Sequence, residues 1–150
     1  MPDESVINEA GASLAGIHPG DKLTLDELLY GLMLPSGNDA ANAIAVHIGG
    51  SVENFVKMMN EEAKRIGAVD TNFVNANGLS DDNHYTTAYD LYLILNEAMK
   101  DSRFVNYAGA ASYSVTYTAA DGSQITKNWK NGNKYITGQE VIPKGVSVEA

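Results

Sequence analysis

The sequence contains no cysteine, which excludes disulfide bonds, thiolate catalysis and cysteine-based zinc sites. No apolar run approaches the roughly 20 residues that a membrane-spanning helix requires. The residues after Met1 lack the basic segment and apolar core of a secretory signal peptide. Basic residues are also scarce, because 10 Lys and Arg stand against 19 Asp and Glu, for a net charge of −9. This balance argues against nucleic acid and anionic membrane as partners, since both need clustered positive charge.

What remains is the composition of a globular protein. The 150 residues suffice for one domain of ordinary size, and 44% of them are hydrophobic. The acidic residues are scattered, which indicates a solvated acidic surface rather than an interaction tail. There is no internal repeat and no low-complexity run.

Capping residues and apolar spacing predict a first helix that ends at a proline. Thr24 and Glu27 have the spacing of a capping box, in which each side chain bonds the other residue's backbone N–H. Pro35 ends this helix near Leu34, because a residue before proline avoids the α conformation. The apolar face repeats at helical spacing in Leu25, Leu28, Leu29 and Leu32.

Two further helices follow directly. The second is expected to restart near Asn38 or Asp39 and to stop at Gly49-Gly50, since glycine favours the helix C-terminus. The third is expected to begin after Ser51 as its cap and to end at Gly67. Their expected apolar positions are Ala41, Ile44, Ala45 and Ile48 in the second helix, and Val52, Phe55, Val56, Met59 and Ala63 in the third.

A fourth helix and then a hairpin are predicted in the second half of the chain. Thr87 and Asp90 resemble another helix cap, and the apolar face that follows comprises Leu91, Leu95, Ala98 and Met99. After Phe104 the period changes, because Tyr113, Val115 and Tyr117 alternate with polar residues as in a strand. The turn signal Asp121-Gly122 precedes a return strand over Ile125 to Trp129.

The predicted fold class is therefore α+β, with a mainly helical subdomain at about residues 20–104 and a β-hairpin region at about 111–130. Residues 5–20 show little periodicity, and the apolar residues of 141–150 have no visible partner strand. A sheet of two strands is also marginal by itself. We therefore expect one partial domain over residues 1–150, with both ends truncated and the rest of a larger sheet missing.

The break between the first two predicted helices is the candidate catalytic corner. Ser36 and Asn38 sit there two residues apart, where both side chains can point into a cleft. The hydroxyl can relay a proton, and the carboxamide can both donate and accept a hydrogen bond. The alternative interpretation is that Ser36 or Asn38 only caps the second helix.

Four segments in order resemble the D-alanyl-D-alanine carboxypeptidases, the low-molecular-mass penicillin-binding proteins of the β-lactamase and transpeptidase superfamily. The resemblance is good over about Ser5 to Phe104 and looser through the hairpin. The segments are GDKLT at 20–24, LYGL at 29–32 running into LPSGNDAA at 34–41, TNFVN at 71–75, and HYTTA at 84–88.

That resemblance implies a β-lactamase-type fold and a site built from three motifs: Ser-x-x-Lys, Ser-x-Asn and Lys-Thr-Gly. In the family, the first serine attacks the D-Ala-D-Ala peptide bond and an acyl-enzyme forms. Ser36 matches the second-motif serine, which implies that it hydrogen-bonds the catalytic lysine and relays a proton to the leaving D-alanine. Asn38 matches the asparagine that holds a substrate amide, and Gly37 lets the turn pass close to the ligand.

The sequence departs from the family in two motifs. No serine starts a Ser-x-x-Lys, since Lys127 lies one position too far from Ser123, and no Lys-Thr-Gly occurs. We therefore expect a fragment of a serine carboxypeptidase that trims peptidoglycan stem peptides, inactive by itself. The resemblance implies stem peptides ending in D-Ala-D-Ala and, for the full-length protein, β-lactam antibiotics as partners. It also implies no cofactor or metal, an extracytoplasmic location in the cell envelope, and any membrane anchor outside this chain.

Other interpretations remain open from the residues. A non-catalytic peptidoglycan-binding or regulatory relative of the same fold is the main alternative, and a β-lactamase is disfavoured because its second motif is usually Ser-Asp-Asn. The oxygen-rich stretch 81–84 with Asp90 does not match a calcium loop. Three aromatic residues favour a place in the core or half-buried in a strand over a sugar-stacking face: Tyr113, Tyr117 and Trp129.

Overall fold

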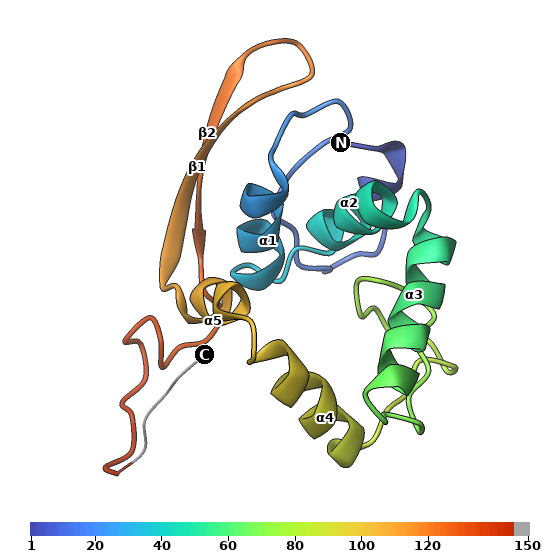
Figure 1. The fold of residues 1–150 in the computed structure, drawn as a ribbon. Coiled ribbons are helices and arrows are strands. Elements are labelled where there is room, and N and C mark those ends of the chain that lie inside the picture. The colour runs from blue at the N-terminus through green and yellow to red at the C-terminus, as the bar shows by residue number, and fades with distance from the viewer. Residues whose placement is uncertain (146–150) are drawn as a thin grey trace.

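The computed structural model describes residues 1–145 of the chain. These residues form a short 3-10 helix, η1, then five α-helices and one antiparallel hairpin (Figure 1). The elements are η1 (Asp3–Ser5), α1 (Leu25–Met33), α2 (Asn38–Gly49), α3 (Val52–Arg65), α4 (Ala88–Ala98), α5 (Ser102–Gly109), β1 (Ser112–Thr118) and β2 (Gln124–Lys130). The predicted α+β class is confirmed.

Local capping accounts for where the predicted helices begin. Thr24 and Glu27 form the reciprocal capping box at the start of α1. The side chains of Ser51 and Thr87 accept backbone N–H groups at the starts of α3 and α4. Gly50, with φ 76°, ends α2 in the left-handed conformation that suits glycine.

Helix α5 was not predicted. It is capped by Asp101, whose carboxylate accepts the N–H of Arg103, and it continues past the point where we expected the helical period to stop. A helix of eight residues offers few repeats of a period, so its pattern is weak in the sequence. A contact with α1 also supports it, because the Tyr107 hydroxyl donates a hydrogen bond to Asp26.

The hairpin pairs β1 with β2 from Ser112 opposite Lys130 to Thr118 opposite Gln124. Its inner face joins the core, where Tyr117 and Trp129 are both buried. Tyr113 is partly buried against the same core, so the prediction that these three aromatic residues are core or half-buried strand residues is confirmed.

The core lies between the hairpin, α1, α2 and an extended segment at residues 13–17, which we call the N-terminal segment. The small side chains of α2 allow this segment to approach closely. The buried hydrophobic residues of the core are Ala15, Ile17, Leu28, Leu34, Ala40, Ala43, Ile44, Val115, Tyr117 and Trp129. This core surrounds the break between α1 and α2.

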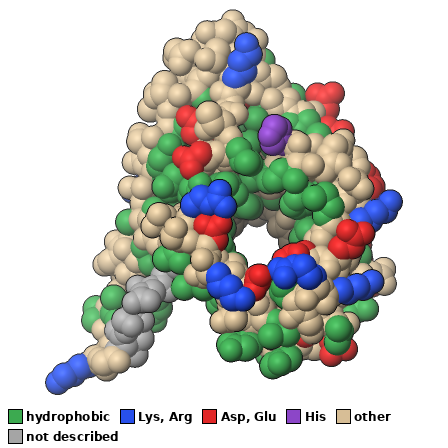
Figure 2. Space-filling view, viewed as in Figure 1, with side chains coloured by type: hydrophobic (Ala, Val, Ile, Leu, Met, Phe, Trp, Pro, Cys, Tyr) green, Lys and Arg blue, Asp and Glu red, His purple; other side chains and the backbone are tan. Residues whose placement is uncertain are grey.

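Helix α4 lies apart from that core. It leads from the region of α3 back to α5, and the space-filling view shows an opening through the molecule between these helices and the rest (Figures 1 and 2). The helix was predicted correctly, but its apolar face is not buried here, since Leu91 and Leu95 are 54% and 52% exposed. Among the described helices, none combines the length and apolarity that crossing a membrane requires.

Candidate functional site

The candidate site is the corner between α1 and α2, residues 35–38. Leu34 closes α1 by donating its N–H to the Tyr30 carbonyl, and Pro35 follows. Ser36 then has φ 56°, and within residues 1–145 no other residue except glycine has a positive φ. A left-handed serine is uncommon and persists only where its surroundings hold it. The corner is therefore a strained turn rather than a relaxed linker.

The Ser36 side chain is exposed at this corner. Within the part of the chain that the structure describes, its hydroxyl forms no hydrogen bond. The hydroxyl is thus available to a group from elsewhere as both donor and acceptor.

Gly37 is required by space and not by its backbone angles. A Cβ atom there would lie 2.5 Å from the Gly31 carbonyl oxygen and 2.9 Å from the Ala15 backbone nitrogen. Its own N–H donates to that Gly31 carbonyl at 3.2 Å. Any side chain at this position would push the corner away from α1 and the N-terminal segment.

Asn38 is buried at the first position of α2. Its backbone N–H and its Nδ2 both donate to the Ser13 carbonyl, at 3.0 and 2.9 Å. Its Oδ1 accepts no hydrogen bond from any described residue. One end of the carboxamide is therefore anchored, while the carbonyl end keeps its acceptor capacity.

The capping interpretation of the corner is wrong. Gly37 is the N-cap of α2 and has no side chain to accept a hydrogen bond. Neither Ser36 nor Asn38 bonds the first-turn N–H groups of α2 that a cap would satisfy. A different role for these two side chains remains a prediction.

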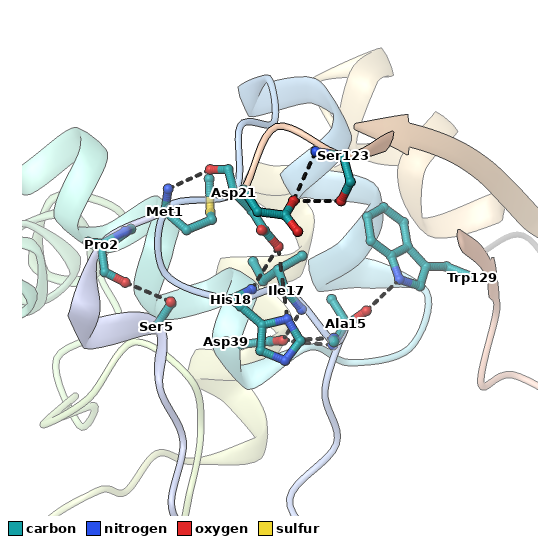
Figure 3. A network of polar contacts seen from close by, with 12 residues as sticks. Met1, Pro2, Ser5, Ala15, Ile17, His18, Asp21, Asp39, Ser123 and Trp129 are labelled. Atoms are coloured by element: carbon teal, nitrogen blue, oxygen red, sulfur yellow. Dashed lines mark hydrogen bonds and ion pairs between the residues drawn. The ribbon is translucent and has the colours of Figure 1, made fainter. Parts of the chain in front are cut away.

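Asp39 is the residue of this site that the sequence interpretation missed. It is 2% exposed, and its carboxylate accepts four backbone N–H groups, among them those of Ala15 and Ile17 (Figure 3). Oδ1 accepts from Ala15 and Ala40 at 2.8 and 2.9 Å. Oδ2 accepts from Gly16 and Ile17 at 2.8 and 3.0 Å. The only local signal was an acidic residue in the first helical turn, which the helix dipole alone would explain.

A second buried carboxylate continues this pattern. Asp21 accepts the His18 N–H at 2.9 Å (Figure 3). Burial, and next the negative charge of Asp21, raise the pKa of Tyr117 to about 12. Asp21 therefore lies where the N-terminal segment meets the hairpin.

The opposite side of the N-terminal segment is held by the hairpin. The indole N–H of Trp129 in β2 donates to the Ala15 carbonyl at 2.9 Å (Figure 3). The segment is thus bonded to α2 on one side and to β2 on the other, so the corner is tied to the whole core.

Two acidic residues of the oxygen-rich region, Asp81 and Asp90, have structural partners. Asp90 is buried and accepts the Asp70 N–H at 2.8 Å and the Thr71 hydroxyl at 2.7 Å. Asp81 accepts the Asn83 N–H within its own turn. No group of three or more potential metal-ligating side chains occurs within residues 1–145.

Comparison with known proteins identifies the family. A family model described as D-alanyl-D-alanine carboxypeptidase matches residues 3–146, so the chain belongs to this peptidase family. The chain is 39% identical over 113 residues to the D-alanyl-D-alanine carboxypeptidase DacF of Bacillus subtilis, covering 73% of this chain and 29% of that protein. It is 38% identical over 132 residues to a D-alanyl-D-alanine carboxypeptidase of a Streptomyces species, covering 83% and 45%.

The solved structures agree with the sequence relatives. The crystal structure of a Streptomyces DD-transpeptidase superposes with a TM-score of 0.79 at 37% identity, over 85% of this chain and 51% of that one. The chain thus spans about half, or less, of the length of the relatives that it matches.

Proposed function

We propose that this chain supplies the second-motif corner of a serine-type D-Ala-D-Ala carboxypeptidase, which trims peptidoglycan stem peptides through an acyl-enzyme. The observation that carries the proposal is Ser36 itself, an exposed residue on a left-handed turn two positions before the buried Asn38. A helix cap or a linker needs neither the strain nor the exposure.

In this proposal the two side chains have separate tasks. Ser36 relays a proton between the catalytic lysine and the leaving D-alanine, which its available hydroxyl allows. Asn38 uses its Oδ1 to accept a hydrogen bond from the substrate amide or the lysine, while Nδ2 remains on Ser13. Gly37 keeps the corner close to α1 so that a ligand can approach it.

The nucleophile and the Lys-Thr-Gly strand are not among these 150 residues, so this chain alone should not turn over substrate. The partners we propose are stem peptides ending in D-Ala-D-Ala and, for the complete enzyme, β-lactam antibiotics. Because this substrate lies outside the cytoplasmic membrane, we place the enzyme in the cell envelope. Acyl transfer by serine and lysine requires no cofactor.

The test uses the full gene product that contains this sequence. We expect a fluorescent penicillin to acylate a serine outside these 150 residues, located by peptide mass, and Ser36→Ala to slow acylation roughly 100-fold or more. Ser80→Ala is the matched control, because Ser80 is also exposed and belongs to none of the three family motifs. Absence of an adduct on the folded protein would favour a non-catalytic relative, and equal rates for both variants would remove Ser36 from the mechanism.

A further inference from the structure

Four consecutive backbone N–H groups, those of residues 15–18, all donate to buried carboxylates. Asp39 takes the first three and Asp21 takes the fourth. Amides of an extended segment normally pair with a strand or with water, so their convergence on side chains needs an explanation.

The backbone at Gly16 produces this convergence. Gly16 has φ 76°, and the N–H groups on it and on both neighbours point at one carboxylate. Successive N–H groups around a left-handed residue form a nest, a concavity that binds anions. Here the anion is internal, because the Asp39 side chain reaches across from α2.

The corner and the N-terminal segment are bonded in both directions. Asn38 donates twice to the Ser13 carbonyl, and the adjacent Asp39 accepts three times from residues 15–17. Two neighbouring residues of α2 therefore hold the same segment, one as donor and one as acceptor. A movement of the segment would displace Asn38 directly and Ser36 through the short turn that joins them.

We propose that Asp39 is the positioning residue of the corner. Its negative charge holds the N-terminal segment against the first turn of α2, and this fixes the strained turn at Ser36 and the orientation of the Asn38 carboxamide. That Asp39 matters for catalysis rests on the proposed function. That Asp39 positions Ser36 and Asn38 does not rest on it.

Asp39→Asn tests the charge with almost no change in size. Each oxygen of the Asp39 carboxylate accepts two N–H groups. An asparagine keeps one such pair and turns its NH₂ donors toward the other pair, so half of the contacts become repulsive. Asp21→Asn is the matched control, because Asp21 is also buried but accepts one backbone N–H, that of His18, and does not adjoin the corner.

The measurement is amide NMR on the isotope-labelled 150-residue chain. For Asp39→Asn we expect shifted backbone signals at 36–38 and exchange of the Asn38 side-chain NH₂ at least tenfold faster. The Asp21→Asn variant should leave those signals in place. The proposal is overturned if Asp39→Asn moves the signals of residues 15–17 and lowers the melting temperature while those of residues 36–38 stay unchanged.

A second variant covers the case in which Asp39→Asn does not fold. Gly16→Ala disturbs the nest from its other side, since alanine disfavours the positive φ of Gly16. Shifted amide signals at residues 36–38 in this variant would support the proposal, and unchanged signals there would overturn it. Neither measurement requires activity. If the complete enzyme proves inactive, the proposed function fails while the role of Asp39 is still decided.

Discussion

Replacing Trp129 by phenylalanine should destabilise the fold by about 2–4 kcal/mol. The indole is 5% exposed, and its N–H reaches the Ala15 carbonyl at 2.9 Å. Phenylalanine leaves that buried carbonyl without its donor, which costs about 1–3 kcal/mol. The lost ring atoms add about 1 kcal/mol through reduced apolar burial and a small cavity. For a chain of this size, the total corresponds to a fall in melting temperature of roughly 4–16 °C.

The assay is urea unfolding followed by far-ultraviolet circular dichroism, because Trp129 is the only tryptophan and its fluorescence is lost in the variant. Tyr89→Phe is the control, since Tyr89 is 68% exposed and its hydroxyl should contribute less than about 0.5 kcal/mol. A Trp129→Phe variant within about 0.5 kcal/mol of the parent chain would refute the inference that β2 holds the N-terminal segment through this bond.

Three further predictions test the ends of the helices. Gly50→Ala should lower the free energy of unfolding in urea by about 1 kcal/mol. The new Cβ meets no neighbour, so the cost comes only from the φ of 76°. An unchanged free energy of unfolding would contradict the left-handed cap. Hydrogen bonding to Asp26 raises the pKa of Tyr107 to about 12, so the bond stabilises the chain below pH 10 and is lost as the pH rises through 12. Carbon NMR titration of the Tyr107 ring in Asp26→Asn should show a lower pKa, and an unchanged value would argue against the α1–α5 contact. The Arg103 side chain lowers the pKa of Asp101 to about 2, so this cap is stabilising above pH 4 and is lost as the pH falls through 2; carbon NMR of Arg103→Gln should find the pKa closer to its ordinary value.

The sequence predicted the helices whose signals are local. Thr24, Ser51 and Thr87 each bond a backbone group three residues away, so the cap and its partner can be seen together in one short stretch. Helix α5 escaped because it is short, and one of its supports, the contact of Tyr107 with Asp26, is remote in sequence. The α4 apolar face was visible as a pattern, but periodicity alone does not say whether anything covers it.

At the corner, too, the sequence predicted what is local and the structure decided what depends on remote contacts. The stretch LPSGNDAA identified Ser36 and Asn38 as a pair, but two interpretations were open for them, a helix cap and a catalytic corner. The structure excluded the cap by placing Gly37 at that position. It also showed four hydrogen bonds to Asp39, a residue to which the sequence interpretation had assigned no role.

By itself, the sequence determined the caps, the helix stops, the alternation of the hairpin and the family motif at 36–38, because each depends on residues within a few positions of one another. Only the tertiary structure decided which carboxylate meets the amides of residues 15–17 and which carbonyl meets the indole of Trp129. Those partners are 22 to 24 and 114 positions apart in the chain. Over such separations, the packing of α1, α2 and the hairpin into one core selects the partner, and local composition does not.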